Sequence, residues 1–247
     1  MTAITDLRPY LAPVATTDRQ GLLAFGDSIT NGGGELQWGV ALQSWAQWLA
    51  RALGLPFTNY AVDGARAADL VGQQIPAHRR LNAVAQPRYQ LGCLYIGVND
   101  VRSPDWDSAA YERDLGAALA YLRDLCDRVL VMTIPLDLGR PQAGAKVPVA
   151  NAIIGRQAEL AGALIVSLAD FAGREVMMFD HVHPTAMGQI AIAERALDVL
   201  AAHGTEVRIR PTALARPDVS PLARARAALT YAYRSGKQAL RIKLASP

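Results

Sequence analysis

The stretch LLAFGDSITNGGG, residues 22–34, runs from consecutive apolar residues into a polar turn and then into three glycines. A short apolar run that ends in glycine is typical of a buried β-strand. We therefore expect a strand over residues 21–26, with Ser28 just beyond its carboxyl end. A serine in that position either belongs to an ordinary tight turn or is held where a ligand can reach it.

The composition predicts one large globular domain. Of the 247 residues, 51% are hydrophobic and 19% are charged, so the chain can bury a sizeable core. Its apolar runs fall short of the roughly 18 residues that a membrane-spanning helix needs, and residues 1–20 lack the pattern of a secretory signal, so we expect a cytoplasmic protein. Cys93, in a strand-like run, and Cys126, in a helix-like run, are expected to be buried structural thiols.

Short apolar segments alternate with longer helical ones along the chain. Further strands are predicted at residues 57–61, 91–97, 128–134 and 163–168. Helices are predicted at residues 39–54, 65–75, 107–126, 149–162 and 184–203. This alternation predicts the α/β class, with a parallel five-stranded sheet covered by helices on both faces.

Polar residues and glycines gather where the first three strands end. These ends read GDS (26–28), NYAVDG (59–64) and GVND (97–100). Because ligands of open parallel sheets bind beyond the carboxyl ends of the strands, we expect the three segments to form one site. Asp27 and Asp100 are expected to support that site by accepting hydrogen bonds from turn amides.

A serine hydroxyl is a useful nucleophile only when a general base removes its proton, which directs the search to the four histidines. His78, in the polar segment PAHRR that we predict as a loop, and His203, at the end of the last helix, have no carboxylate placed in sequence to orient them. In FDHVHPTAMG (179–188), Asp180 and His183 are three residues apart. In a turn, that spacing lets the carboxylate accept the imidazole Nδ1–H.

The same segment leaves alternatives open. His181 is a rival base, although the side chains of adjacent residues such as Asp180 and His181 tend to diverge. His181 and His183 could instead hold a metal ion, but no third ligand accompanies them at a recognisable spacing. Pro184 biases His183 away from helical geometry and suits the first position of the following helix, which predicts a rigid junction at His183.

Acyl transfer also needs hydrogen-bond donors aimed at the developing oxyanion. Gly64 and Asn99, at the ends of the second and third strands, offer a backbone amide and a side-chain amide. Trp45 fits the apolar face of its helix, whereas Trp106, just past Asn99, is predicted to line the rim of a substrate pocket. The Gly- and Pro-rich loop 135–148 has the length and composition of a lid.

Four blocks in this order resemble the signature blocks of the GDSL, or SGNH, hydrolase family. They are GDSIT with Ser28, the glycine of NYAVDGA, GVND with Asn99, and DHVHP with Asp180 and His183. The resemblance spans roughly residues 20–203, and the joint occurrence of the blocks is far more specific than any single block. The chain departs from the family at Ala61, where a further glycine is common.

The resemblance implies a flavodoxin-like, three-layer α/β/α fold and a site without metal or organic cofactor. Ser28 would be the nucleophile and His183 the base and then the acid, with Asp180 orienting His183. The backbone N–H groups of Ser28 and Gly64 and the side chain of Asn99 would form the oxyanion hole.

The implied activity is that of a serine ester hydrolase, which acts through a covalent acyl-enzyme on small carboxylic esters. These include lysophospholipids, thioesters and O-acetyl sugar esters. Two alternatives remain, an acyltransferase of the same fold and a catalytically silent lipid-binding module.

The chain ends in a basic segment. Residues 205–247 hold nine Lys and Arg and two acids, a net charge of +7, which leaves −4 for residues 1–204. We expect a hydrolase domain over 1–204, a linker over 205–220 and a basic amphipathic helical tail over 221–247. Nucleic acid is not expected as a partner, because no recognition motif accompanies the charge.

The tail has two interpretations. Leu222, Leu229, Tyr233 and Leu240 fall near one helical face, which suits peripheral contact with an anionic membrane surface. The alternative is a helix packed on the hydrolase body or on a second subunit. Gly236, which weakens an isolated helix by about 1 kcal/mol relative to alanine, favours this alternative. The sequence carries no indication of the oligomeric state.

Overall fold

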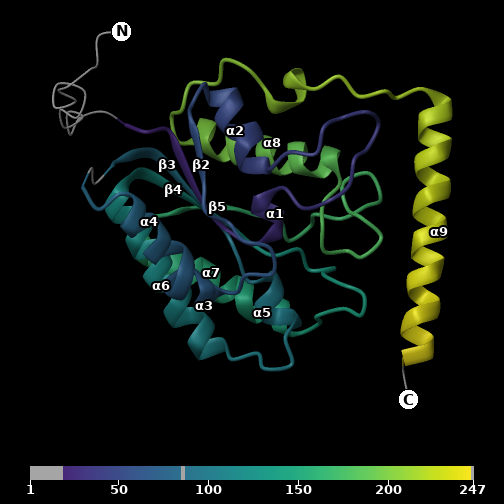
Figure 1. The fold of residues 1–247 in the computed structure, drawn as a ribbon, viewed down its shortest axis with the longest axis horizontal. Helices are drawn as coiled ribbons and strands as arrows, with labels where there is room; N and C mark the ends of the chain where they lie inside the picture. The colour runs from purple at the N-terminus through teal and green to yellow at the C-terminus, as the bar shows by residue number, and fades with distance from the viewer. Residues whose placement is uncertain (1–18, 85–86, 246–247) are drawn as a thin grey trace, which may run out of the picture.

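The computed structural model describes residues 19–84 and 87–245, and these form a five-stranded parallel sheet with helices on both faces (Figure 1). The strands are β1 (Leu22–Gly26), β2 (Phe57–Asn59), β3 (Tyr89–Tyr95), β4 (Cys126–Met132) and β5 (Leu164–Val166). Their order in the sheet is β2-β1-β3-β4-β5, which is the flavodoxin-like order. The predicted α/β class and three-layer architecture are therefore confirmed, and the strand order reverses between β1 and β3.

The helices divide into two layers. They are α1 (Ser28–Asn31), α2 (Trp45–Leu53), α3 (Ala67–Asp69), α4 (Ile75–Leu81), α5 (Val98–Arg102), α6 (Ser108–Leu125), α7 (Lys146–Ala161), α8 (Ala186–Ala202) and α9 (Pro221–Ala245). The pair α2 and α8 covers one face of the sheet, and α3, α4, α6 and α7 cover the other (Figure 1). The short α1 and α5 follow the carboxyl ends of β1 and β3, where the predicted site residues lie.

The central strands β1 and β3 are largely apolar and buried because helices cover both of their faces. In β1, the four residues 22–25 are at most 1% exposed, and Leu22 is paired in register with Leu91 of β3. Trp45 of α2 is fully buried, which confirms its assignment to the core. The short edge strand β2 is only half-buried, because it has a neighbour on one side alone.

The prediction that His78 lies in a polar loop is wrong. The helix expected to end at residue 75 continues through one π-helical segment, Leu70–Gln74, into α4. Pro76 is the second residue of α4 and follows the π-helical segment directly. His78 is 2% exposed, and its Nδ1 and Nε2 lie 2.7 and 3.1 Å from the hydroxyls of Tyr121 and Tyr89. This burial lowers the pKa of His78.

The helical assignment of Cys126 is also wrong, because α6 ends at Leu125 and Cys126 is the first residue of β4. Both cysteines are nevertheless buried free thiols, as expected. Burial raises the pKa of Cys126 to about 12 and that of Cys93 well above its ordinary value. Neither thiol is therefore a nucleophile at neutral pH.

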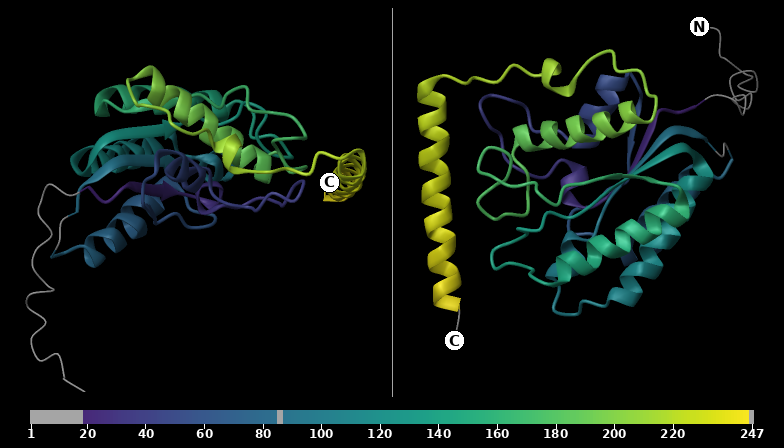
Figure 2. Two further views of the ribbon diagram at one scale, coloured as in Figure 1. Left: turned by 90° about the horizontal axis from the view of Figure 1, so that it is seen from above. Right: turned by 180° about the vertical axis from the view of Figure 1, so that it is seen from behind.

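The segment predicted as a linker is in large part attached to the body. Within it, a 3₁₀ turn (Pro211–Leu214) lies against α8, where Glu194 accepts hydrogen bonds from the N–H and the hydroxyl of Thr212 at 2.8 and 2.7 Å. Arg210 forms ion pairs with Glu194 and Asp198. Beyond this attachment α9 runs along the side of the molecule where α1 lies (Figure 2). The end of the predicted tail, residues 246–247, lies outside the described residues, as do residues 1–18 of the predicted hydrolase domain.

Candidate active site

Ser28 is the first residue of α1 and follows β1 after a single intervening residue, Asp27. The Oδ1 atom of Asp27 accepts a hydrogen bond from the N–H of Ile29 at 2.9 Å and so caps the helix. Gly26 has a φ of +154°, and a Cβ atom at this position would lie 2.4 Å from the carbonyl oxygen of Tyr95. Only glycine therefore allows β1 to end this close to β3, which fixes where the serine emerges.

Ser28, His183 and Asp180 form a chain of hydrogen bonds. The Oγ atom of Ser28 lies 3.0 Å from Nε2 of His183, across 155 residues of sequence. On the other side of the ring, Nδ1 of His183 lies 2.8 Å from Oδ2 of Asp180. The second oxygen of Asp180 accepts hydrogen bonds from the backbone N–H groups of Val182 and His183 at 2.9 and 3.1 Å. The carboxylate is thereby fixed by its own turn before it orients the imidazole.

The hydrogen bond between Asp180 and His183 stabilises the charged forms of both side chains. The hydrogen bond that His183 donates to Asp180 raises the pKa of His183, although partial burial opposes the increase. Burial also acts to raise the pKa of Asp180, but hydrogen bonds from the His183 ring and from two backbone N–H groups outweigh it and hold that pKa below its ordinary value. Asp180 is therefore ionised at neutral pH, and it favours the imidazolium form of His183.

His181, the rival base, faces a different carboxylate. Its Nδ1 lies 2.9 Å from Oδ2 of Asp137, in the loop that follows β4. Arg140 donates to both oxygens of Asp137 and is the main reason that the pKa of Asp137 is lowered to about 2. Among residues 19–84 and 87–245, no three His, Cys, Asp or Glu side chains are grouped so that they could hold a metal ion. His181 therefore ties the 135–145 loop to the turn that carries His183.

Gly64 and Asn99 lie in two turns that are joined to each other and to the end of β1. The N–H of Val62 donates to the carbonyl of Gly26 at 3.1 Å, which brings the 62–65 turn alongside Ser28. The side-chain amide of Asn99 donates to the carbonyl of Ala65 at 3.0 Å. Gly64 has a φ of +78° and nothing within 4 Å of where a Cβ atom would be, so its backbone is accessible. The structure thus brings both predicted donors to the edge of the sheet that carries Ser28.

Asp100 and Asp27 are supports, as expected. Both oxygens of Asp100 accept from the N–H of Ala67, at 3.1 and 3.2 Å, which holds the chain just after Gly64. Burial raises the pKa of Asp100 to about 6 and that of Asp27 to about 7. Within the described residues, Oδ2 of Asp27 is buried and has no hydrogen-bond partner. Asp27 is thus a carboxyl group whose charge is poorly compensated.

Two glutamines that the sequence analysis did not identify hold the serine turn from beneath. The side chain of Gln74 exchanges two hydrogen bonds with the backbone of Gly26, at 3.1 and 2.8 Å. Gln189 of α8 donates to the carbonyls of Ile29 and Gly33 at 3.0 and 2.9 Å and accepts from the N–H of Trp45 at 2.7 Å. Both side chains are buried. Because α8 follows His183 directly, Gln189 sets the serine turn and the histidine turn at a fixed separation.

Two other predictions near the site have different outcomes. Pro184 does not occupy the first position of the helix, because α8 begins at Ala186 with Thr185 as its N-cap. Pro184 instead forms an isolated β-bridge with Met177, which still anchors the residue next to His183. Trp106 is half-buried, and its ring packs against Tyr111 at 5.3 Å between centroids. Its role at a substrate rim stays a prediction.

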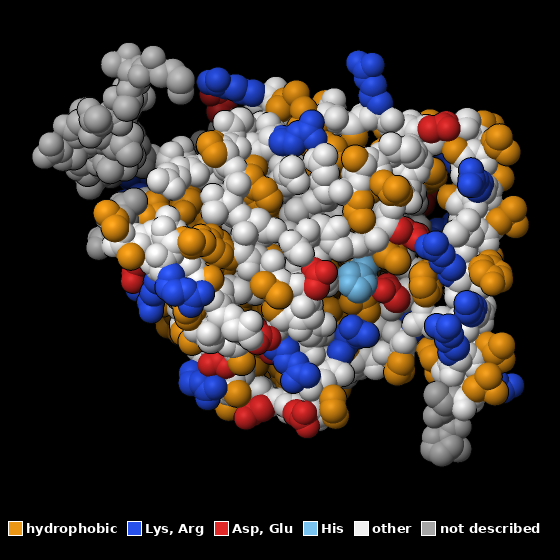
Figure 3. Space-filling view, in the orientation of Figure 1, with side chains coloured by type: hydrophobic (Ala, Val, Ile, Leu, Met, Phe, Trp, Pro, Cys, Tyr) orange, Lys and Arg blue, Asp and Glu red, His pale blue; other side chains and the backbone are white. Residues whose placement is uncertain are grey.

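Charged side chains gather on the face that Figure 3 draws, where an exposed histidine has acidic side chains on both sides and basic ones below. Arg102, at the end of α5, is exposed and close enough to His183 to lower its pKa in part. An ester that carries negative charge would therefore meet a cation beside the hydrogen-bonded chain.

Comparison with solved structures finds similar folds in two other proteins. LAE5, an alpha/beta hydrolase enzyme from the metagenome of Lake Arreo in Spain, is 22% identical with a TM-score of 0.57, and the match covers 75% of this chain and 97% of that one. Axe2, an acetylxylan esterase from Geobacillus stearothermophilus, is 21% identical with a TM-score of 0.57, and the match covers 80% and 100%. A catalytic mutant of Axe2 matches with a TM-score of 0.59 at 21% identity, over 77% of this chain and 97% of that one.

These likenesses, below 25% identity, are likenesses of fold. No protein with a curated description matches the chain. The sequence profile of the GDSL-like lipase/acylhydrolase family, however, matches residues 24–191, which include every residue of the hydrogen-bonded chain described above. The protein therefore belongs to the GDSL-like lipase/acylhydrolase family and is an enzyme of the esterase type.

Proposed function

We propose that the protein hydrolyses small carboxylic esters through a covalent acyl-enzyme formed on Ser28. The observation that carries the proposal is the continuous chain from Ser28 Oγ to His183 Nε2 at 3.0 Å and from His183 Nδ1 to Asp180 at 2.8 Å. A serine, a base within hydrogen-bond distance and a carboxylate that orients the base are the parts that nucleophilic acyl transfer requires.

In the proposed acylation step, Ser28 Oγ attacks the ester carbonyl carbon and passes its proton to Nε2 of His183. With Nδ1–H donated to Asp180, the lone pair of Nε2 faces the serine, and the carboxylate stabilises the imidazolium that forms. The tetrahedral intermediate then collapses. The bond to the alcohol oxygen breaks, His183 gives its proton to the leaving alcohol, and the acyl group remains on Ser28.

Deacylation reverses these roles with water as the nucleophile. His183 takes a proton from water as the oxygen attacks the acyl carbon, and it then returns that proton to Ser28 Oγ as the acid departs. The backbone N–H groups of Ser28 and Gly64 and the side-chain amide of Asn99 are the proposed donors to the oxyanion in both steps. Ser28 N–H belongs to the first turn of α1, where backbone donors are free of intrahelical partners.

The test is labelling of the purified protein by a fluorophosphonate probe, together with hydrolysis of p-nitrophenyl acetate, butyrate and octanoate. We expect wild-type protein to be labelled and Ser28→Ala to be neither labelled nor active, with an unchanged circular dichroism spectrum. Gln157→Ala, a change on α7, serves as the matched control. Labelling that persists in Ser28→Ala would contradict the proposed nucleophile.

The same panel distinguishes the alternatives. Acetate is included because the structural neighbour Axe2 is an acetylxylan esterase. Octanoate reports on longer acyl chains, such as those of lysophospholipids. Ester products formed with added acceptor alcohols would indicate an acyltransferase. A folded wild-type protein that binds ligand without labelling or turnover would indicate a silent lipid-binding module.

A further inference from the structure

Helix α9 carries a row of exposed apolar side chains. These are Leu222, Leu229, Tyr233, Leu240 and Leu244, with exposed fractions of 80, 73, 70, 58 and 77%. We call them the outer stripe. Their spacing of seven, four, seven and four residues brings them to one face of the helix. Figure 3 shows apolar side chains along the outer edge of α9, with basic side chains beside them.

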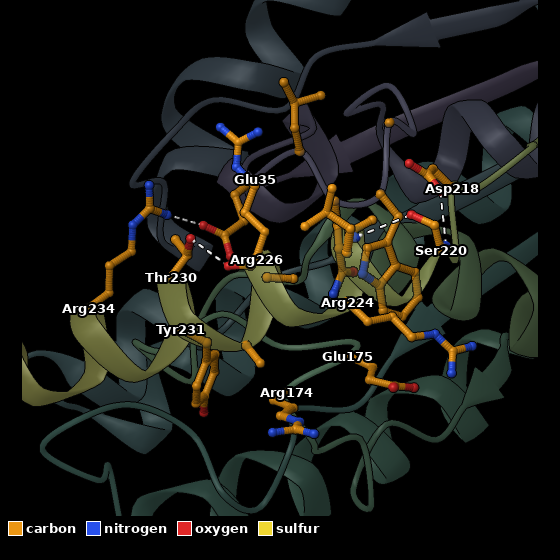
Figure 4. Close-up of a pocket in the computed structure, with 18 residues that line it drawn as sticks. Glu35, Arg174, Glu175, Asp218, Ser220, Arg224, Arg226, Thr230, Tyr231 and Arg234 are labelled. Atoms are coloured by element: carbon orange, nitrogen blue, oxygen red, sulfur yellow. Dashed lines mark hydrogen bonds and ion pairs between the residues drawn. The ribbon is translucent and has the colours of Figure 1, made fainter.

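The opposite face of α9 is the one that contacts the body. Arg234 forms an ion pair with Glu35, and Gln238 donates to the carbonyl oxygen of Arg140 at 3.1 Å. Between α9 and the body is a cavity of about 1020 Å³, whose lining includes Tyr231 and, near the start of the helix, also Leu222 and Arg226 (Figure 4). The helix therefore packs on the body, as the alternative interpretation expects, but it does so with the face opposite the outer stripe, which stays exposed.

The charge of α9 identifies the kind of surface that fits the outer stripe. The helix contains six basic residues and no acidic one, and Arg226, Lys237, Arg241 and Lys243 flank the stripe. Two copies of such a helix, paired through their stripes, would bring these cations against one another. A surface that is negative at its rim and apolar beneath satisfies both features, and an anionic lipid bilayer has that structure.

We propose that α9 docks in the plane of an anionic lipid bilayer, with the outer stripe at the boundary between headgroups and acyl chains and the flanking cations among the headgroups. In the part of the chain that the structure covers, no helix combines the length and apolar content that crossing a bilayer requires. The contact is therefore peripheral.

Docking in this way orients the enzyme. In Figures 1 and 2, α9 stands on the side of the sheet where α1 begins, beyond the carboxyl ends of the strands. Its contacts Glu35 and Arg140 lie in two loops that follow β1 and β4 and lead away from that same edge. The net charge of −4 on residues 1–204 opposes attachment through the body, so the bilayer meets α9 first.

The test is co-sedimentation of the full chain with vesicles of 30% phosphatidylglycerol in phosphatidylcholine and with vesicles of phosphatidylcholine alone. We expect pelleting with the anionic vesicles, little with the neutral ones, and weaker pelleting at high salt. Lys237→Gln with Arg241→Gln should lower the partition coefficient about 25-fold, at roughly fivefold for each cation removed. Leu229→Glu with Leu240→Glu should lower it at least tenfold.

The matched control is Leu81→Glu with Leu160→Glu, which makes the same change at two exposed leucines of α4 and α7. It should pellet like the wild type. Equal pelleting with both vesicle types, no pelleting at all, or binding that the α9 variants leave intact would overturn the proposal. A dimer in solution that Leu229→Glu with Leu240→Glu dissociates would assign the stripe to a second copy instead. Repeating the assay with Ser28→Ala separates docking from hydrolysis, because docking does not depend on the serine.

Discussion

The turn around Ser28 is tied into the interior by buried hydrogen bonds, whereas α9 lies on the outside and contacts the body through a few polar groups. Gln74 and Gln189 together make five hydrogen bonds to backbone groups around the serine turn and α2. The ion pair of α9 with Glu35 is partly exposed to solvent. Proton transfer needs atoms fixed to tenths of an ångström, while surface docking needs only an oriented face.

The largest effect should come from removing the base within the rigid region. We expect His183→Ala to lower kcat on the order of 10⁶-fold, because Ser28 then has no group to take its proton. Kinetics with p-nitrophenyl acetate would measure the loss, and a thermal melt would show that the variant is folded. A loss of less than tenfold would mean that another group serves as base.

Asp180→Asn should have the next largest effect, up to roughly 10⁴-fold in kcat, because the amide favours the wrong tautomer of His183. Asp180 also raises the pKa of His183. Activity requires the neutral imidazole, so the wild-type rate should rise with pH through a value above the usual 6.5 of histidine. In the variant this acid limb should move to lower pH. A pH profile that stays in place would show that Asp180 does not control the base.

Asp27→Asn should change how the free energy of unfolding depends on pH, because the wild-type protein buries a carboxyl group at this turn. The folded pKa of about 7 lies above the unfolded value, so the folded state retains a proton between about pH 4 and 7 that the unfolded chain releases. Asp27 therefore lowers wild-type stability as pH rises, by a free energy on the order of 4 kcal/mol above pH 7. Urea unfolding should find the variant more stable than the wild type at pH 8 and similar at pH 4. If the difference in free energy of unfolding between variant and wild type were the same at pH 4 and pH 8, Asp27 would not be the source of the pH dependence.

Gln189→Met should lower kcat by about 10- to 100-fold while KM changes little, because the serine and histidine turns lose their common anchor. Gln157→Met on α7 provides the matched control, since that glutamine contacts Glu112 rather than the serine turn. Rates would be corrected for the folded fraction. A less stable variant with wild-type kcat would make Gln189 purely structural.

The smallest effect should come from α9. Arg234→Ala should change the free energy of unfolding by less than about 1 kcal/mol and leave kcat/KM for p-nitrophenyl acetate within about twofold. Hydrogen exchange over residues 221–245 should become faster, because a contact with the body is lost. Arg226→Ala removes the same charge without breaking the ion pair and should exchange like the wild type. A tenfold loss of activity in Arg234→Ala would mean that α9 takes part in shaping the site.

The strands of the sheet and the polar residues at their ends could be predicted from the sequence. Buried parallel strands are continuous apolar runs, and the turns at their ends need small or polar residues. The sequence was insufficient for His78, since a proline inside a helical pattern usually marks a helix end, whereas here the helix continues past Pro76 after the π-helical segment. Cys126 was misplaced because α6 passes into β4 without a turn.

The supporting residues of the site could not be predicted for a different reason. Gln74 and Gln189 belong to no motif, and their partners lie 48 and more than 140 residues away. The contact of His181 with Asp137 likewise depends on how two loops pack. For α9, the spacing of the apolar residues predicted a stripe. Which face meets the body depends on tertiary contacts, such as those of Arg234 and Gln238, that periodicity does not contain.

The attachment of the 3₁₀ turn to α8 limits how far the last helix can move. Residues 215–220 connect the two, and six residues at about 3.5 Å each reach roughly 20 Å when fully extended. A helix that released Glu35 would therefore remain in the neighbourhood of the loops it left, at an effective concentration in the millimolar range. Release and return are thus unimolecular events, whose balance does not depend on how much of the protein a cell makes.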